Sequence, residues 1–301
     1  MAVNRITFGL DRYSFFPYLK KWRIGDVILV PAVFLATLVN DYWSDPFQRQ
    51  FVISDITINH PFAEKERVPN EVNMIYSLVF PVIVIVVVST ILGNPRHRLY
   101  LTYISLLGLF VSFFVNEFFT DVLKNWIGRH RPDFIARCVP RDDAPRDILV
   151  FAKDVCTTKN LDRLADGFRT TPSGHSSSAF SGLGYLSLWL MGQLLTGHPL
   201  TGSWRKVIAL QPALGAALIA LSRTEDYRHH FVDVVLGSCL GMSMAYWAYR
   251  RNFPELTSPI AFKPCLDDSD VGLEEIAVND ADHGDDTEAH LLSRQLNYQA
   301  A

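Results

Sequence analysis

The stretch VFPVIVIVVVSTILG, residues 79–93, decides the fold class of this chain. Its β-branched residues would suit a buried strand, but its length and its lack of charge favour a helix that crosses a membrane. Similar apolar runs, each near the roughly 20 residues that a helix needs to cross the hydrocarbon, occur at about 24–40, 72–93, 99–119, 176–195, 207–221 and 231–249. The sequence therefore predicts an all-α, polytopic membrane protein with six transmembrane helices.

Basic residues beside the predicted spans indicate the orientation. They are Lys20, Lys21, Arg23, Arg96, Arg98, Arg205, Lys206, Arg250 and Arg251. With six spans they all fall on one side of the membrane, and Lys and Arg near span ends favour the cytoplasmic side. Both termini are then predicted to be cytoplasmic, and the segments at about 41–71, 120–175 and 222–230 share the opposite face.

The composition predicts one membrane domain followed by an acidic tail. From Pro254 onward, eleven Asp and Glu residues stand against Lys263 and Arg294, a net charge of −9. The whole chain has a formal net charge of −3, so the remainder, the difference between these values, carries +6. We expect residues 1–253 to form the domain, with catalytic loops 120–175 and 222–233 on the non-cytoplasmic face, and residues 254–301 to be a disordered cytoplasmic tail.

Two cysteines fall in a segment predicted to be non-cytoplasmic, which is the only compartment here that permits a disulfide. We expect Cys138 and Cys156 to be bridged and to stiffen the loop. The alternative is two reduced thiols, because spacing alone does not prove proximity. The chain has no CxxC pair and no four-ligand zinc pattern, so we predict neither a metal nor a cofactor.

The gap between the last two predicted spans, SRTEDYRHHFVDVVLG at residues 222–237, is rich in ionisable side chains. His229 and Asp233 are four residues apart, which places them on one helical face within mutual reach. A carboxylate that holds one imidazole nitrogen protonated leaves the other with a free lone pair, and this makes a nucleophile or a base. His230 could make the same contact, and either histidine could simply be satisfied by an acid at a helix entrance.

A second segment, TTPSGHSSSAF at residues 170–180, lies on the same predicted face. Pro172 and Ser173 are typical of a helix start, and Gly174 lets the backbone approach a ligand closely. The exposed amides and the positive dipole end of such a helix favour an anion, and His175 in the first turn could donate a proton. The serines that follow could instead pack membrane helices, and only Ser173 is expected to contact a ligand.

Three cations complete the predicted anion site. Lys124, Arg131 and Arg223 supply fixed positive charge around the helix terminus, which suits a phosphate with two or three negative oxygens. Each could equally anchor the chain to lipid headgroups at the membrane edge. Four other arginines of the same loop are given that interpretation: Arg129, Arg137, Arg141 and Arg146.

Three groups of residues together resemble the three-part signature of the type 2 phosphatidic acid phosphatase superfamily. They are Lys124 and, after six residues, Arg131-Pro132; PSGH at 172–175; and Ser222-Arg223 and, after five residues, His229 with Asp233. Each part alone is common, but the combination is highly specific. Over most of its length the chain is also similar to fungal diacylglycerol pyrophosphate phosphatases, for example in FAKDVCTTKNLDRLADGFRTTPSGHSS at 151–177 and PCLDDSDV at 264–271.

The resemblance implies a Mg²⁺-independent phosphatase with a phosphohistidine intermediate. His229 would attack phosphorus, Asp233 would orient it, and His175 would protonate the leaving oxygen and later activate water. The non-bridging oxygens would be held by Lys124, Arg131, Arg223 and the amides of Ser173 and Gly174.

The same resemblance implies that the substrates are membrane lipid phosphates in the bilayer. Diacylglycerol pyrophosphate would be hydrolysed to phosphatidate, and phosphatidate to diacylglycerol, with the site on the luminal face of a fungal vacuolar membrane. We expect no nucleic-acid partner, and the sequence does not define an oligomeric state.

Three alternatives remain open at this point. The first is a phosphatase for sphingoid-base phosphates or polyprenyl pyrophosphates. The second is a membrane transporter, although the ionisable cluster sits at span ends and not at the midplane. The third is a zinc site, although three nearby cations would oppose the metal; its ligands would be His175, His229, His230 and Asp233.

Overall fold

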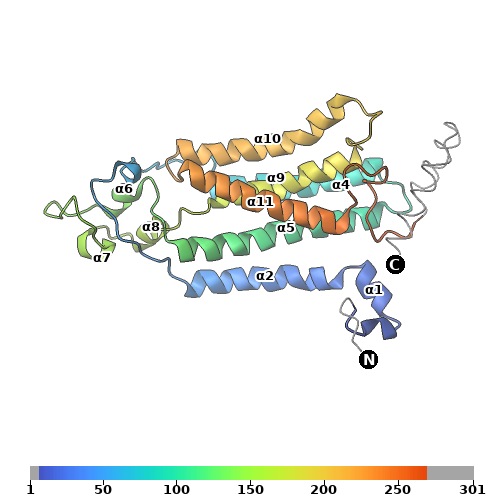
Figure 1. The fold of residues 1–301 in the computed structure, drawn as a ribbon, viewed down its shortest axis with the longest axis horizontal. Coiled ribbons are helices and arrows are strands. Elements are labelled where there is room, and N and C mark those ends of the chain that lie inside the picture. The colour runs from blue at the N-terminus through green and yellow to red at the C-terminus, as the bar shows by residue number, and fades with distance from the viewer. Residues whose placement is uncertain (1–6, 270–301) are drawn as a thin grey trace.

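The computed structural model describes residues 7–269, and within them every named element is a helix. Six long helical segments run side by side (Figure 1). They are α2 (Ile24–Trp43), the continuous segment α3 (Asn70–Met74), η3 (Ile75–Val79) and α4 (Phe80–Leu92), then α5 (Arg98–Ile127), α9 (Gly174–Gln193), α10 (Ser203–Glu225) and α11 (Phe231–Asn252). The middle element of the continuous segment, η3, is a π-helical turn. The predicted all-α fold is confirmed.

Among the helices of the described residues, five are long and apolar enough to cross a membrane, and α9 is the remaining long one. Both α9 and α2 are 20 residues long, but glycines and serines lower the hydropathy of α9. Its position explains this, because it packs against α3, η3, α4, α5, α10 and α11 and buries most of its side chains. A helix enclosed by others needs small residues for close packing more than it needs an apolar surface for lipid.

The third predicted span is longer than expected. The apolar run suggests an end near residue 119, whereas α5 continues to Ile127. It ends where Gly128 adopts a left-handed conformation with φ 60°, a common way to terminate a helix. The extension places Lys124 on α5 and not in a loop.

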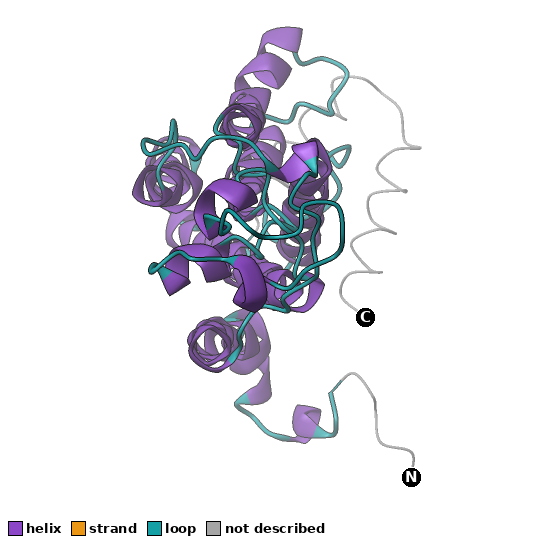
Figure 2. Ribbon diagram, turned by 90° about the vertical axis from the view of Figure 1, so that its left-hand side faces the viewer, coloured by secondary structure: helices purple, strands orange, loops and turns teal. Residues whose placement is uncertain are grey.

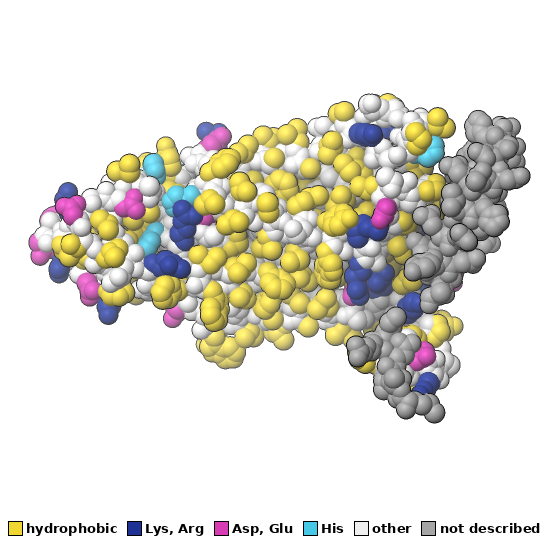
Figure 3. Space-filling model, in the orientation of Figure 1, with side chains coloured by type: hydrophobic (Ala, Val, Ile, Leu, Met, Phe, Trp, Pro, Cys, Tyr) yellow, Lys and Arg dark blue, Asp and Glu magenta, His cyan; other side chains and the backbone are white. Residues whose placement is uncertain are grey.

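A broad apolar band crosses the middle of the face shown in Figure 3, while charged side chains gather toward the two ends of this face. Exposed apolar residues on three different helices illustrate it: Leu35 on α2, Ile83 on α4 and Leu214 on α10. Such a continuous apolar surface is unfavourable in water but suits the hydrocarbon of a bilayer. The protein is therefore an integral, multi-pass membrane protein.

The loops predicted to share one face do lie at the same end of the bundle. Residues 44–69, 128–173 and 226–230 gather there, and Figure 2 views the bundle from this end. The helix α1 and residues 254–269, which follow α11, lie at the opposite end (Figure 1). The remaining short helices are η1 (Leu10–Arg12), α1 (Phe16–Lys21), η2 (Ile56–Ile58), α6 (Phe134–Cys138), α7 (Ala152–Val155) and α8 (Leu161–Asp166).

The two long loops at that end form a cap with its own apolar core. Phe51 from the first loop packs with Phe134 and Phe168 from the second. A disulfide joins Cys138 to Cys156, with Cα atoms 4.7 Å apart. The cap is therefore a folded unit that can hold side chains over the bundle.

Two glycines set how closely α11 approaches α9. A Cβ atom on Gly237 would lie 2.5 Å from the carbonyl oxygen of Ser173, and one on Gly241 would lie even closer to that of Ser177. Backbone atoms cannot swing away as the end of a side chain can, so only glycine permits this spacing. The contact matters for the site, because α9 begins with the PSGH segment and α11 follows His229.

The first part of the predicted tail, residues 254–269, has a defined place in the structure. Residues 254–269 pack against the end of the bundle opposite the cap, and Ile260 and Ala261 are buried there. Acidic residues pair with basic ones from the span ends: Asp267 lies 2.8 Å from Nδ1 of His97, and Asp268 lies 2.7 Å from Nζ of Lys21. The other predicted tail residues, 270–301, lie outside the described residues.

Candidate active site

His229 lies buried in the turn between α10 and α11. Its Nδ1 is 2.8 Å from the carbonyl oxygen of Thr170. A carbonyl oxygen only accepts hydrogen bonds, so Nδ1 carries the proton and Nε2 keeps a free lone pair. Nε2 lies 3.5 Å from Nη1 of Arg131, so the nitrogen with the free lone pair faces a cation.

The surroundings of His229 keep its ring neutral. Burial is the main cause that holds the pKa of His229 well below its usual value, and the charges of Arg131, Arg223 and Lys124 act in the same direction. These three are the cations that the sequence assigned to phosphate. The structure therefore gathers them around a histidine that has an unprotonated nitrogen at neutral pH.

Asp233 approaches His229 through Thr170 and not directly. Among the described residues, no hydrogen bond joins the Asp233 carboxylate to His229, although their spacing predicts one. The carboxylate instead accepts hydrogen bonds from the backbone N–H of His230 at 2.8 Å and from Oγ1 of Thr170 at 2.8 Å. His230 caps α11 and Asp233 is the third residue of that helix, so a capping box turns the carboxylate back toward the helix start.

The start of α9 has the predicted form, with one change in its amides. Ser173 caps the helix, because its Oγ accepts a hydrogen bond from the backbone N–H of Ser176. The amide of Ser173 donates to the carbonyl of Asp233 at 3.0 Å. Because the Ser173 amide is occupied by this bond, the predicted phosphate-binding amide that remains is that of Gly174. It lies in the first turn of α9, where backbone N–H groups have no intrahelical partner.

Lys124 reaches this helix start from the end of α5. A Cβ atom on Gly174 would lie 2.6 Å from Nζ of Lys124, so the glycine leaves the space that the ammonium group occupies. Nζ also lies 3.5 Å from the carboxylate of Asp121. The two sequence motifs that contain Lys124 and Gly174 therefore meet in space.

Arg131 is held by the cap. Its Nη2 pairs with the Asp166 carboxylate at 2.8 Å, and its Nε donates to the Asp166 carbonyl at 2.9 Å. Burial opposes ionisation of Asp166, but Arg131 and Arg137 outweigh it and hold the pKa of this carboxyl far below its usual range. The ion pair fixes the guanidinium while leaving Nη1 beside His229.

Two of the four arginines interpreted as lipid anchors have other roles. Arg137 is buried inside the cap, paired with Asp133 and Asp166 at 2.8 Å each. Arg129 donates from Nη1 to Asp233 at 3.1 Å. The interpretation was wrong for the buried Arg137, because it did not foresee that the loop folds over the bundle and supplies acidic partners. The Arg129 side chain remains 40% exposed.

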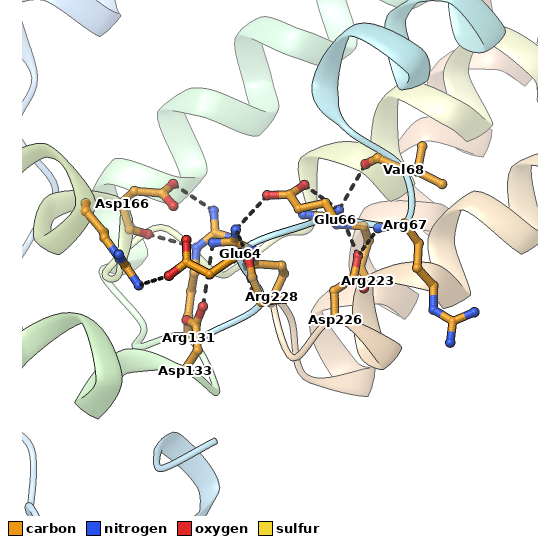
Figure 4. A network of polar contacts seen from close by, with 12 residues as sticks. Glu64, Glu66, Arg67, Val68, Arg131, Asp133, Asp166, Arg223, Asp226 and Arg228 are labelled. Atoms are coloured by element: carbon orange, nitrogen blue, oxygen red, sulfur yellow. Dashed lines mark hydrogen bonds and ion pairs between the residues drawn. The ribbon is translucent and has the colours of Figure 1, made fainter. Parts of the chain in front are cut away.

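A segment of the first loop, residues 60–68, crosses the site and is here named the crossing segment. The carbonyl oxygen of Val68 accepts from Nε2 of His175 at 3.0 Å and from Nη1 of Arg223 at 3.2 Å. The Glu66 carboxylate lies between the guanidinium groups of Arg223 and Arg228 (Figure 4). His175 and Arg223 thus both lie in the site, and oxygen atoms of the crossing segment accept their hydrogen bonds.

The structure brings all the predicted catalytic and phosphate-binding residues to one end of the bundle, and it adds some that the sequence reading missed. The additions are Thr170, Thr171, Arg129, Glu66 and Arg228. The first two directly precede PSGH and Arg228 directly precedes His229, so their neighbours could have drawn attention to them. Among residues 7–269, no group of three or more His, Cys, Asp or Glu side chains is placed to hold a metal ion.

A family model described as the PAP2 superfamily matches residues 105–255. The chain belongs to the PAP2 superfamily. The matched region of this PAP2 chain contains α9, α10, α11 and most of α5, together with all three signature motifs. The crossing segment lies outside it.

Curated relatives extend the similarity beyond the PAP2 region. Diacylglycerol pyrophosphate phosphatase 1 of Saccharomyces cerevisiae is 55% identical over 291 residues, which cover 97% of this chain and 99% of that protein. Probable diacylglycerol pyrophosphate phosphatase 1 of Schizosaccharomyces pombe is 41% identical over 78% of this chain and 83% of its own. Lipid phosphate phosphatase 2 of Arabidopsis thaliana is 31% identical over 82% of this chain and 81% of its own. No solved structure matches the chain.

Proposed function

We propose that this PAP2 protein is a lipid phosphate phosphatase that hydrolyses diacylglycerol pyrophosphate to phosphatidate, and phosphatidate to diacylglycerol. The observation that carries the proposal is the free lone pair of His229 Nε2, which lies among three cations at one end of a membrane bundle. A phosphoryl group offers phosphorus to the lone pair and negative oxygens to the cations. The 55% identity to a yeast protein named for diacylglycerol pyrophosphate supports this choice of lipid.

The proposed reaction has two steps. Nε2 of His229 attacks phosphorus, and the bond from phosphorus to the leaving oxygen breaks. His175, in its imidazolium form in the substrate complex, donates its Nε2 proton to that oxygen and becomes neutral. Water then gives a proton to His175 and attacks phosphorus, and the phosphorus–nitrogen bond breaks to release phosphate and restore His229. Lys124, Arg131 and Arg223 stabilise the charge on the phosphoryl oxygens in both steps.

His175 must exchange one hydrogen bond during this reaction. Its Nε2 proton is donated to the carbonyl oxygen of Val68. The leaving oxygen of the substrate therefore takes the position of this carbonyl, and the crossing segment yields when substrate binds. The lipid chains stay in the hydrocarbon, because the site lies at the end of the apolar band.

We place the site on the luminal face of the fungal vacuolar membrane, with both termini in the cytoplasm. The basic residues at the opposite end of the bundle support this orientation. The disulfide in the cap also supports it, because such bonds persist in oxidising compartments. The organelle is inferred from the similarity to fungal diacylglycerol pyrophosphate phosphatases.

The proposal is tested by phosphate release in mixed micelles that contain EDTA. The substrates are diacylglycerol pyrophosphate, phosphatidate, a sphingoid-base phosphate and a polyprenyl pyrophosphate, and the wild type is compared with His229→Ala. We expect turnover to be fastest on diacylglycerol pyrophosphate and to be lost in the variant. Fastest turnover on one of the last two lipids would replace the substrate, and unchanged activity in folded His229→Ala would exclude the nucleophile.

A further inference from the structure

Two buried guanidinium groups share one carboxylate at the edge of the phosphate site (Figure 4). Arg223 and Arg228 are 2% and 7% exposed. One carboxylate oxygen of Glu66 lies 2.8 Å from Nη1 of Arg223, and the other lies 2.8 Å from Nη2 of Arg228. The Nε atoms of both arginines are buried without a hydrogen-bond partner among the described residues. The pair therefore offers more donors than Glu66 satisfies.

The other contacts of Arg228 hold its side chain in place. Nη2 also donates to the carbonyl oxygen of Ala63 at 3.1 Å, and Nη1 lies 3.6 Å from the Asp133 carboxylate. The guanidinium carbon lies 4.2 Å from the ring centre of Phe62. Arg228 is thus fixed beside the phosphate site, and among the hydrogen bonds of the described residues none joins its side chain to His229.

The contacts of Val68 show where Glu66 lies relative to the leaving group of the proposed reaction. The carbonyl of Val68 holds the proton of His175 that passes to the leaving oxygen, so the leaving group lies on the side of the crossing segment. Glu66 precedes Val68 by two residues, and both bind Nη1 of Arg223. In a diphosphate, the group attached to the leaving oxygen is a second phosphoryl group. Its oxygens would fall where the Glu66 carboxylate now lies.

We propose that Arg223 and Arg228 form a subsite for the second phosphoryl group of a diphosphate lipid, and that Glu66 fills this subsite when no diphosphate is bound. Two carboxylate oxygens on two guanidinium groups match the charge and the donor geometry of two phosphoryl oxygens. A monophosphate lacks the second group, and so it leaves Arg228 paired with Glu66. This inference rests on the proposed function and makes Arg228 and Glu66 determinants of specificity.

The first test compares kcat/KM for diacylglycerol pyrophosphate and for phosphatidate in Arg228→Gln and Arg228→Lys. We expect the ratio of the two values to fall about tenfold in Arg228→Gln, the size of one charge-assisted contact, and to fall less in Arg228→Lys. The control is Arg67→Gln, because Arg67 belongs to the crossing segment but pairs with Glu225 at the surface. Equal losses on both substrates in Arg228→Gln would overturn the subsite.

The second test uses Glu66→Gln, which keeps the size of the side chain and serves if the Arg228 variants do not fold. We expect the inhibition constant of methylenediphosphonate to fall about tenfold, because a neutral amide competes less for the two arginines, while that of methylphosphonate changes less. No change, or equal changes, would overturn the proposal. A wild type that hydrolyses neither lipid would refute only the proposed function, and calorimetric binding of the two phosphonates to wild type and Glu66→Gln would still test the subsite.

Discussion

Thr170 links Asp233 to His229 by hydrogen bonds to both residues. Its carbonyl oxygen holds the Nδ1 proton of His229, and its hydroxyl donates to the Asp233 carboxylate. This arrangement does for His229 what a direct carboxylate contact would do, because it fixes the tautomer and the direction of the ring. The carboxylate also accepts from Arg129 and Thr171, so it stays charged and ordered.

We predict that Thr170→Val lowers kcat about 10- to 100-fold, as loss of an orienting partner commonly does, with little change in KM. Valine has the shape of threonine but removes the hydroxyl that links Thr170 to Asp233. The control is Thr157→Val, because the hydroxyl of Thr157 bonds to the carbonyl of Val139 in the same loop. Steady-state kinetics in micelles measure both variants. If Thr170→Val kept the wild-type kcat, the link through threonine would have no part in catalysis.

The charge of Arg131 should be visible in the pH dependence of the reaction. Protonation removes the lone pair of His229, so activity falls as the pH drops through its pKa, which burial and the cations lower from 6.5. Arg131→Gln removes one of the cations that lower this pKa. The pH below which kcat/KM falls should therefore rise by on the order of one pH unit. The pH profile of the residual activity measures this, and the wild type with the same lipid controls for ionisation of the substrate. An acid limb at the same pH in both proteins would contradict the assignment.

Residues with local partners could be predicted from the sequence, whereas residues with distant partners could not. The PSGH segment predicts the start of α9, and the three-residue spacing of His230 and Asp233 allows the contact that their side chains make at 3.1 Å. Glu66 and Arg223 are 157 residues apart, and nothing in either local sequence couples them. The pair exists because the first loop folds back over the bundle, which only the tertiary structure reveals.

At the scale of the elements, the most informative helix is α9, the long helix that is not among the five apolar enough to cross a membrane. The length of its apolar run predicts that α9 spans the membrane, whereas its mean hydropathy is too low for it to count among the candidate spans. The disagreement has a physical cause, because a helix that faces protein on all sides exchanges apolar bulk for close approach. Its glycines and serines allow α11 to lie against it, and that contact brings His229 to the start of α9.

We therefore predict that Gly241→Ala lowers both stability and activity, because the added methyl would collide with the backbone of α9 at Ser177 and Ser181. Overpacking of this kind costs about 1–3 kcal/mol, and the shift of α11 should reduce kcat by more than KM rises. The matched control is Gly215→Ala on α10, where the new methyl would only touch Leu183 at 3.7 Å. Melting temperature in detergent and kinetics measure the two variants. Equal melting temperatures and equal kcat values would contradict the role of this helix contact.

At the scale of the whole molecule, the charges divide the protein into two different ends. The end near α1 carries the basic residues of the span ends, and residues 254–269 place Asp267 and Asp268 against them. The other end carries the cap, whose buried arginines pair with acids inside the same unit. The apolar band between them keeps the two polar ends on opposite sides of a bilayer. Orientation thus decides which compartment meets the candidate active site.

This orientation can be measured by cysteine labelling in intact vacuoles, the proposed location of the protein. In a background with Cys239→Ala and Cys265→Ser, one variant carries Lys153→Cys in the exposed part of the cap and another carries Lys206→Cys at the opposite end. A membrane-impermeant maleimide should label Lys206→Cys in intact vacuoles and Lys153→Cys only after permeabilisation, because basic span ends remain in the cytoplasm. Labelling of both variants after permeabilisation controls for access to the thiols. The reverse pattern would place the cap, and with it His229, on the cytoplasmic face.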